Sequence, residues 1–387
     1  MIIETAERLK GTEAYYFARK LKQISTLNDE GASVINLGIG SPDLPPAPSV
    51  IQALQQSAEN PAKHGYQSYQ GLPGLRDAIS QYMQAHYGFT ADPNGEILPL
   101  IGSKEGIMHI AMAFLNPGDR MLIPNPGYPT YAAVGKLCQA EVMTYPLDEA
   151  NDWAPSVEAI QQLPLDEVKI LWLNYPHMPT GAPGNPEIIQ QLLKLARKHH
   201  FLIVNDNPYN QLFTPPAFSI FQLPDAKEVA LELHSMSKSH NMAGWRLGWL
   251  TGHADYLNMV LKVKSNMDSG MFYALQQAAI EALGLSQDYY EAIRTTYAER
   301  RKMAQQLFDT LQIAVKKPQE GMFLWGKIPD RHESGEKLSD KILDTARVFI
   351  TPGFIFGTQG ERYLRISLCS PVAALQEALE RIKNAAI

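Results

Sequence analysis

The residues best suited to chemistry in this sequence surround one lysine, Lys238. It lies in the stretch Ser235-Met-Ser-Lys-Ser-His-Asn-Met-Ala-Gly-Trp-Arg-Leu-Gly248, among three serines and eight positions before Arg246. A lysine that forms a Schiff base must be held partly desolvated, and hydroxyl groups with a guanidinium nearby would bind a phosphate. Taken alone, a lysine in a serine-rich loop is more often simply solvated. The rest of the chain must therefore supply the partners of a catalytic lysine.

Composition limits the classes of function. The chain has 387 residues, of which 45% are hydrophobic and 19% charged, as is usual for a globular protein. The formal net charge of −6 provides no overall basic field for nucleic acid or membrane. The N-terminus does not read as a signal peptide, and no apolar run is long enough for a membrane span. Two cysteines, Cys138 and Cys369, predict a reducing compartment with neither a disulfide framework nor a metal site, so we expect a cytoplasmic protein.

Short apolar runs alternate with helical patterns through the middle of the chain. Seven runs are expected to be strands: 97–101, 120–124, 140–144, 169–173, 201–205, 229–233 and 247–251. Strands separated by helices predict a mainly parallel seven-stranded sheet with helices on both faces, an α/β fold. Ligands of such sheets bind beyond the carboxyl ends of the strands. Polar residues that could bind a ligand or take part in catalysis should therefore follow the apolar runs.

Such residues do follow five of the runs. Gly102-Ser-Lys-Glu-Gly106 comes after the first and opens a helix, whose N-terminal N–H groups favour an anion. The second run is followed by 125–131, which contains Tyr128, and the fourth by 174–181. The fifth run is followed by 206–209 and the sixth by Lys238. Each turn alone is a weak signal, but together they converge on one edge of the predicted sheet.

The two ends of the chain have a different pattern. Residues 34–45 predict a short strand and a Gly/Pro loop, where backbone at Gly38 and Gly40 can approach a ligand closely. A long amphipathic helix is expected over 287–312 as a connector, followed by alternating short strands and helices. We therefore predict a large domain over 46–285 and a smaller α+β domain built from both termini, 1–45 and 286–387.

Together these motifs resemble the pyridoxal-phosphate enzymes of fold type I, the aspartate aminotransferase superfamily of class I/II aminotransferases. The most specific match is Ser-x-Ser-Lys-x-x-x-Met-x-Gly-x-Arg-x-Gly at 235–248, and the second is Asp-x-x-Tyr at 206–209. The resemblance runs from about residue 15 to 370 and is nearest to the branch with LL-diaminopimelate aminotransferases. It implies pyridoxal 5′-phosphate as cofactor and amino transfer from an L-amino acid to a 2-oxoacid by a ping-pong mechanism.

The resemblance implies roles at the cofactor. Lys238 would be the Schiff-base lysine and proton shuttle. Asp206 would face the pyridine nitrogen and keep it protonated, and Tyr209 would donate a hydrogen bond to the phenolic oxygen. Tyr128 would stack on the ring. The residues that would hold the phosphate are Ser103, Lys104, Ser235, Ser237 and Arg246.

The resemblance also implies a substrate side and a partner. Arg365, in Tyr363-Leu-Arg-Ile-Ser367, would clamp the substrate α-carboxylate bidentately. Gly40 and Tyr15 match substrate-side positions. Tyr66 matches a tyrosine that reaches the phosphate of the neighbouring subunit, which implies a homodimer with shared active sites.

One position departs from the family pattern. The family usually has Asn-Pro-Thr-Gly where this chain has Met178-Pro-Thr-Gly181. The asparagine normally donates a hydrogen bond to the cofactor's phenolic oxygen, and a thioether has no proton to donate. We expect the pKa of the lysine–cofactor Schiff base to be higher here than with asparagine, unless His177 or water replaces the donor.

Other functions are open from the sequence. A pyridoxal-phosphate lyase acting at Cβ or Cγ would use the same residues. A non-catalytic regulatory module is disfavoured, because the key lysine, aspartate, tyrosine and arginines are all present. The substrate is open as well, since Tyr15, His64 and residues 67–69 fit aromatic, dicarboxylic or diamino compounds alike.

Overall fold

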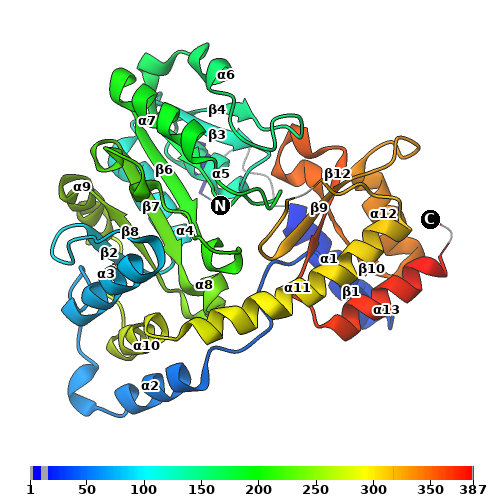
Figure 1. The fold of residues 1–387 in the computed structure, drawn as a ribbon, viewed down its shortest axis with the longest axis horizontal. Helices are drawn as coiled ribbons and strands as arrows, with labels where there is room; N and C mark the ends of the chain where they lie inside the picture. Colours follow the sequence, from blue (N-terminus) through cyan, green and yellow to red (C-terminus); the bar gives the residue numbers. More distant parts are fainter. Residues whose placement is uncertain (1–2, 10–15, 317, 386) are drawn as a thin grey trace.

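A seven-stranded sheet forms the centre of the larger part of the molecule (Figure 1). A computed structural model of the chain describes residues 3–9, 16–316, 318–385 and 387. The strands are β2 (Ile97–Leu100), β3 (Arg120–Asn125), β4 (Glu141–Pro146), β5 (Val168–Leu173), β6 (Leu202–Asn207), β7 (Ala230–Ser235) and β8 (Gly248–Gly252). Their order is β2-β8-β7-β6-β5-β3-β4, and only β8 runs antiparallel to its neighbours. The predicted strands and the mainly parallel α/β sheet are confirmed.

Helices cover both faces of this sheet because successive strand side chains point to opposite sides. On β3, Met121 and Ile123 join the core beneath one set of helices, whereas Leu122 joins the core on the other face. The first face carries α4 (Ser103–Phe114), α5 (Pro129–Leu137) and α9 (Ala254–Lys264). The other carries α6 (Val157–Gln161) and α7 (Pro186–His199), with α2 (Pro48–Ala58), α3 (Pro73–Tyr87) and α10 (Tyr273–Leu283) towards the β2 edge.

The smaller part of the molecule combines segments from both ends of the chain. Parallel pairing of β1 (Ile35–Asn36) with β10 (Val348–Phe349) joins them, and Figure 1 shows the blue and orange segments side by side. An antiparallel sheet lies beside this pair, in the order β11 (Thr351–Pro352), β12 (Tyr363–Ser367) and β9 (Phe323–Lys327). Its helices are α1 (Tyr16–Asp29), α12 (Gly335–Ala346) and α13 (Val372–Lys383). The proposed domain limits, 46–285 against 1–45 and 286–387, stay a prediction.

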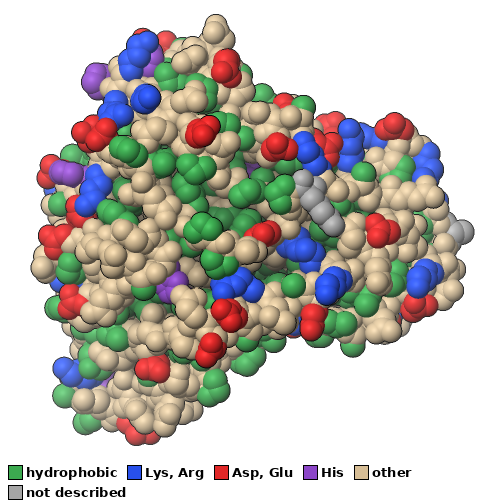
Figure 2. Space-filling model, in the orientation of Figure 1, with side chains coloured by type: hydrophobic (Ala, Val, Ile, Leu, Met, Phe, Trp, Pro, Cys, Tyr) green, Lys and Arg blue, Asp and Glu red, His purple; other side chains and the backbone are tan. Residues whose placement is uncertain are grey.

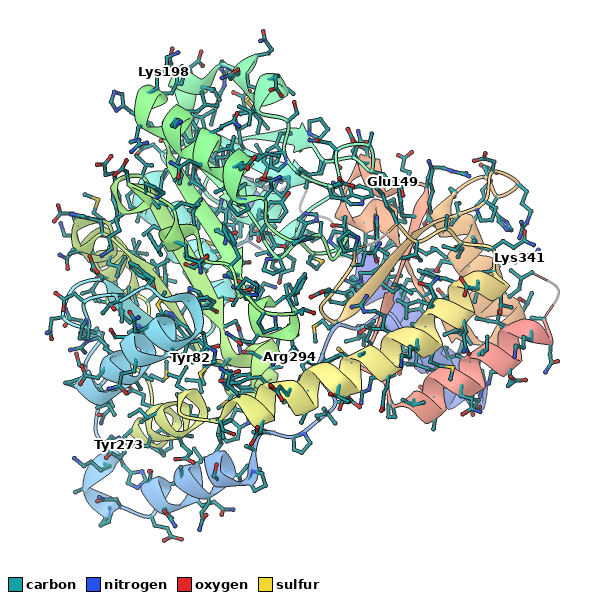
Figure 3. All side chains as sticks on the ribbon, viewed as in Figure 1. Tyr82, Glu149, Lys198, Tyr273, Arg294 and Lys341 are labelled. Atoms are coloured by element: carbon teal, nitrogen blue, oxygen red, sulfur yellow. The ribbon has the colours of Figure 1, made fainter. Side chains whose placement is uncertain are left out.

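One long helix, α11 (Gln287–Thr310), joins the two parts (Figure 1). Near its start, Arg294 donates a hydrogen bond from Nη1 to the carbonyl of Gln211, 3.2 Å away, beneath the large sheet (Figure 3). Further along, α11 packs against β9 and α13. The helix predicted over 287–312 as a connector is therefore present and contacts both parts.

The surface carries no large patch of one charge on the face drawn in Figure 2, where acidic and basic side chains are interspersed. This agrees with the small net charge of −6. Within the described part of the chain, no helix is both long enough and apolar enough to cross a membrane. The two cysteines are both free thiols.

Candidate active site

A pocket of about 520 Å³ lies between the carboxyl edge of the large sheet and the strands β9 and β12. All the predicted site residues line it except Tyr15 and Tyr66: Gly40, Ser103, Lys104, Tyr128, Asp206, Tyr209, Ser235, Ser237, Lys238, Arg246 and Arg365. Tyr15 lies outside the described residues. Tyr66 is 92% exposed in the loop before α3 and does not reach the pocket of its own chain. The structure therefore brings together groups at the ends of β2, β3, β6 and β7, Arg246 before β8, and groups from both ends of the chain.

Lys238 stands on a short helix, α8 (Met236–Ser239), directly after β7. Its Nζ donates a hydrogen bond to the Gly40 carbonyl, 2.5 Å away. Burial lowers the pKa of Lys238, and the positive charges of Arg365 and Arg246 lower it further. The amine is thus moved towards its neutral, nucleophilic form. Ser235 caps α8, accepting a hydrogen bond from the Ser237 N–H at 3.2 Å.

Asp206, at the end of β6, has one carboxylate oxygen without a partner. The residue is 4% exposed, and its Oδ2 accepts a hydrogen bond from the Tyr131 hydroxyl at 2.8 Å. No described residue contacts Oδ1 by a hydrogen bond, although this atom is buried. Burial raises the pKa of Asp206 to about 7, against the lowering effect of Tyr131. A protonated pyridine nitrogen in the pocket would satisfy Oδ1 and restore the carboxylate charge, so Asp206 fits the cofactor.

Two residues that support Asp206 lie in turns that the sequence analysis singled out, but the sequence assigned them no role. Tyr131 is fully buried on α5 and stacks on Trp172, with ring centroids 4.8 Å apart. Asn174, after β5, donates from Nδ2 to the Asp206 carbonyl at 2.7 Å and accepts from the Met178 N–H at 3.1 Å. Asn174 could have been found, because it follows its strand directly as the predicted site residues do. Tyr131 could not, because a tyrosine inside a helix has no distinctive signal.

The part of the pocket formed by the start of α4 suits a phosphate. Helix α4 begins at Ser103, and no side chain caps its N-terminus, so its first N–H groups can face an anion. Arg246 packs against the preceding residue, Gly102. A Cβ added to Gly102 would lie 2.2 Å from Arg246 Nη2, so only glycine allows this approach. Hydroxyls of Ser235 and Ser237 line the same pocket, and this donor set fits a dianionic phosphate.

Arg365 is held in the pocket wall by two aromatic rings. Its guanidinium carbon lies 4.1 Å from the centroid of Phe323 and 4.7 Å from that of Phe356. Its Nη2 donates to the Gly38 carbonyl at 2.7 Å, and its Nη1 lies 3.4 Å from the Met178 sulfur. The planar guanidinium is therefore fixed in orientation, as bidentate binding of a carboxylate requires.

Two tyrosines complete the walls. Tyr209 packs edge-on against Phe323 at 5.8 Å between ring centroids, and burial raises the pKa of its hydroxyl, which remains a donor. Tyr128 immediately precedes α5 and packs edge-on against Tyr131, with ring centroids 5.6 Å apart. Both rings line the pocket, as expected.

His177 does not line the pocket, although Met178 beside it does. The His177 Nδ1 lies 2.7 Å from the Thr180 hydroxyl. Burial lowers the pKa of His177 to about 3, so its ring is neutral. His177 therefore does not replace the donor that is missing at Met178.

Comparison with known proteins identifies the family. The sequence model for aminotransferase class I and II matches residues 32–382. The chain belongs to this family. It is an aminotransferase, and the family implies pyridoxal phosphate with amino-acid and 2-oxoacid substrates. The similarity favours amino-group transfer over the elimination chemistry left open by the sequence.

Its relatives are similar over their whole length. The LL-diaminopimelate aminotransferase of Aquifex aeolicus (strain VF5) is 39% identical over 387 residues, which cover 99% of each chain. The solved structure of substrate-bound BacF from Bacillus subtilis superposes with a TM-score of 0.94 at 34% identity, covering 99% of this chain and 98% of the other. A probable N-succinyldiaminopimelate aminotransferase from Thermus thermophilus gives a TM-score of 0.87 at 32% identity, covering 95% and 99%.

Proposed function

We propose that this aminotransferase binds pyridoxal 5′-phosphate in the pocket described above and moves the amino group of an L-amino acid to a 2-oxoacid by a ping-pong mechanism. One observation carries the proposal. Lys238 and Asp206, whose Oδ1 has no hydrogen-bond partner, line the same pocket, and the uncapped start of α4 lies in that pocket as a site for an anion. When bound, the cofactor supplies a protonated ring that accepts electrons from the substrate Cα. Substitution at Lys238 tests this assignment.

Lys238 is proposed to hold the cofactor covalently and then to move the substrate proton. Its lowered pKa favours the neutral amine, which can attack a carbonyl and take a proton from Cα. The Gly40 carbonyl, 2.5 Å from Nζ, accepts a hydrogen bond from the amine and fixes its position. The same lysine can return the proton, so one group acts as base and acid.

The remaining site residues are proposed to bind and orient. Asp206 carries the negative charge that keeps the ring nitrogen protonated, while Tyr209 donates to the ring oxygen and Tyr128 stacks on the ring. The phosphate would be held by Ser103, the Lys104 backbone N–H, Ser235, Ser237 and Arg246, and by Tyr66 of a second subunit. Arg365 would clamp the α-carboxylate, with Gly40 and Tyr15 on the substrate side.

We propose a homodimer, in which the exposed Tyr66 ring serves the neighbouring active site. The supporting observation is that this tyrosine is 92% exposed and does not line the pocket of its own chain. A cytoplasmic location is proposed from the two free cysteines.

The test is incubation of the holoenzyme with amino acids and 2-oxoglutarate. Formation of glutamate supports transfer, whereas pyruvate and ammonia in the absence of an acceptor would indicate elimination. Lys238→Ala should abolish turnover and shift the absorbance of the bound cofactor. Transamination at the wild-type rate by Lys238→Ala would refute the assignment. The relatives named for LL-diaminopimelate make that compound one of the first donors to assay.

A further inference from the structure

A second pocket, of about 810 Å³, lies between α11 and β9. Leu324 of β9 lines it, whereas Phe323, the preceding residue on the strand, lines the candidate active site. Successive residues of a strand point to opposite faces, so β9 separates the two pockets. They have no described lining residue in common. The second pocket is therefore distinct from the site assigned to the cofactor.

One side of α11 brings three cations to this pocket. Arg294, Arg301 and Lys302 line it, and their spacing of seven or eight residues is about two helical turns, so they project from the same side of the helix. Figure 3 labels Arg294, near the start of α11. Among the described lining residues the one acidic side chain is Glu320, which accepts a hydrogen bond from the Thr214 N–H. Three cations against one carboxylate leave an excess of two positive charges.

Backbone carbonyls, and not carboxylates, bind the two arginines. Arg301 donates from Nη1 to the Phe323 carbonyl at 3.1 Å and from Nη2 to the Gly321 carbonyl at 2.5 Å. Burial lowers the pKa of Arg301 to about 10, although the charge of Glu320 raises it, so the guanidinium is charged at neutral pH and partly desolvated. A desolvated cation with only neutral partners is stabilised when an anion binds beside it.

The rest of the lining suits the body of an organic molecule. Leu212 and Leu324 form a buried apolar part, and Thr214 and Gln305 add a hydroxyl and an amide. The volume lies within the range of pockets that hold small organic ligands, which are mostly apolar with a few polar groups that fix orientation. An inorganic ion would leave the apolar part uncovered.

We propose that this pocket binds an organic anion with at least two negative charges, and that the bound anion inhibits the enzyme. Arg301 is the link to the active site, because it also holds the Phe323 carbonyl, and the Phe323 ring lies 4.1 Å from the guanidinium carbon of Arg365. An anion that draws Arg301 away from this carbonyl loosens the ring beside Arg365 and so weakens binding of the amino donor. The inhibition, unlike the binding, rests on the proposed role of Arg365.

Calorimetric titration of the holoenzyme tests the site with citrate, 3-phosphoglycerate and sulfate. We expect saturable binding of at least one of the two organic probes, with a Kd about tenfold higher or more in Lys302→Glu, because the substitution reverses one of the three positive charges. The preference between citrate and 3-phosphoglycerate shows whether carboxylates alone or a phosphate is recognised. Lys302 is exposed, so the variant should fold.

Lys341→Glu is the matched control, because Lys341 is an exposed lysine of α12 that does not line the pocket, and its Kd should equal that of wild type. Equal Kd values for wild type and Lys302→Glu, or no saturable binding of either organic probe, would overturn the site. Sulfate that binds as tightly as the organic probes would mean an adventitious ion only, and would also overturn it.

The inhibition is measured in the half-reaction with L-glutamate, followed by the absorbance of the bound cofactor. A saturating organic probe should raise the KM by about fivefold in wild type and Lys341→Glu, but not in Lys302→Glu. Binding without a rise in KM would refute the inhibitory role. An equal rise in Lys302→Glu would mean that the probe competes at Arg365 instead. Amino transfer to 2-oxoglutarate without added anion tests the proposed function separately, so either proposal can fail alone.

Discussion

Arg300 on α11 forms a bidentate ion pair with Asp43 through both terminal nitrogens of its guanidinium. The Nη1–Oδ1 distance is 2.6 Å and the Nη2–Oδ2 distance is 2.9 Å, and Nη1 also donates to the Leu368 carbonyl. Asp43 lies in the loop between β1 and α2, which also carries Gly38 and Gly40, and the carbonyls of these glycines accept hydrogen bonds from Arg365 and Lys238. The connecting helix therefore anchors the loop that contacts both Lys238, the proposed Schiff-base lysine, and Arg365, the proposed carboxylate-binding residue.

Asp43→Asn should destabilise the fold and weaken substrate binding. Arg300 is only 4% exposed, so removal of its counter-charge leaves a buried cation unpaired. We expect the free energy of unfolding to fall by about 3 kcal/mol, with a higher KM for the amino donor. Denaturant unfolding and half-reaction kinetics measure the two effects.

Asp340→Asn is the control for Asp43→Asn. The Lys20–Asp340 pair is as short, 2.6 Å, but the Asp340 side chain is 42% exposed, so a loss below about 1 kcal/mol is expected. Equal losses at the two positions would contradict a special role for the Arg300 pair.

The pH dependence of the free energy of unfolding should report the titration of the Asp206 carboxyl. Its folded pKa of about 7 lies above the unfolded value of about 4, so the folded state holds the proton more tightly. In the cofactor-free protein, this stabilisation is complete below pH 4 and is lost as the pH rises towards 7. The difference in unfolding free energy between wild type and Asp206→Asn should change by at most about 4 kcal/mol over that range. A constant difference from pH 4 to pH 7 would show that the carboxyl titrates normally.

The sequence predicted the sheet well because strands buried on both faces consist of nearly continuous apolar runs, such as Val168–Leu173. It also predicted the pocket, because site residues follow those runs. Contacts between distant segments were not predictable. Arg300 and Asp43 are 257 positions apart, and their pairing depends on how α11 crosses the small part. The same holds for Phe17 and Phe356, which line one pocket only when both ends of the chain fold together.

Tyr131→Phe should weaken cofactor binding. Loss of the 2.8 Å hydrogen bond to Asp206 removes a donor that lowers the pKa of this carboxyl, so Asp206 becomes a poorer partner for a cationic ring nitrogen. A hydrogen bond to a charged group contributes about 1.5–3 kcal/mol, which corresponds to about a 10–100-fold rise in Kd for the cofactor. Titration of the cofactor-free protein with pyridoxal phosphate, followed by absorbance, measures this Kd.

Tyr145→Phe is the matched control for Tyr131→Phe. Tyr145 is equally buried and donates to the Trp172 carbonyl at 2.7 Å, but does not line the pocket. It should lose stability without a change in Kd. A Kd for Tyr131→Phe within twofold of wild type would exclude the proposed support of Asp206.

Met178→Asn should lower the pKa of the Schiff base between Lys238 and the cofactor. The Met178 sulfur lies 3.4 Å from Arg365 Nη1 and has no proton to donate to the ring oxygen, which leaves Tyr209 as the proposed donor. A restored hydrogen bond to an anionic oxygen, about 1.5–3 kcal/mol, corresponds to about one to two pH units. Absorbance of the bound cofactor against pH gives the value. Met178→Leu, which adds no donor, should leave the pKa near that of wild type. Identical pKa values for wild type and both variants would refute the proposal that the missing donor at residue 178 raises the Schiff-base pKa.

Gly102→Ala should damage the phosphate site specifically. The new Cβ would meet Arg246 Nη2 at 2.2 Å and force the guanidinium away from the start of α4, and the φ of +84° adds backbone strain. Gly118→Ala shares a positive φ, +88°, but its Cβ would meet nothing within 4 Å, so it separates strain from displacement of Arg246. Loss of one charge-assisted contact predicts a rise of about tenfold or more in Kd for pyridoxal phosphate with Gly102→Ala alone. Pyridoxal, which lacks the phosphate, should bind both variants about equally. Equal weakening of pyridoxal and pyridoxal phosphate in Gly102→Ala would place the phosphate away from Arg246.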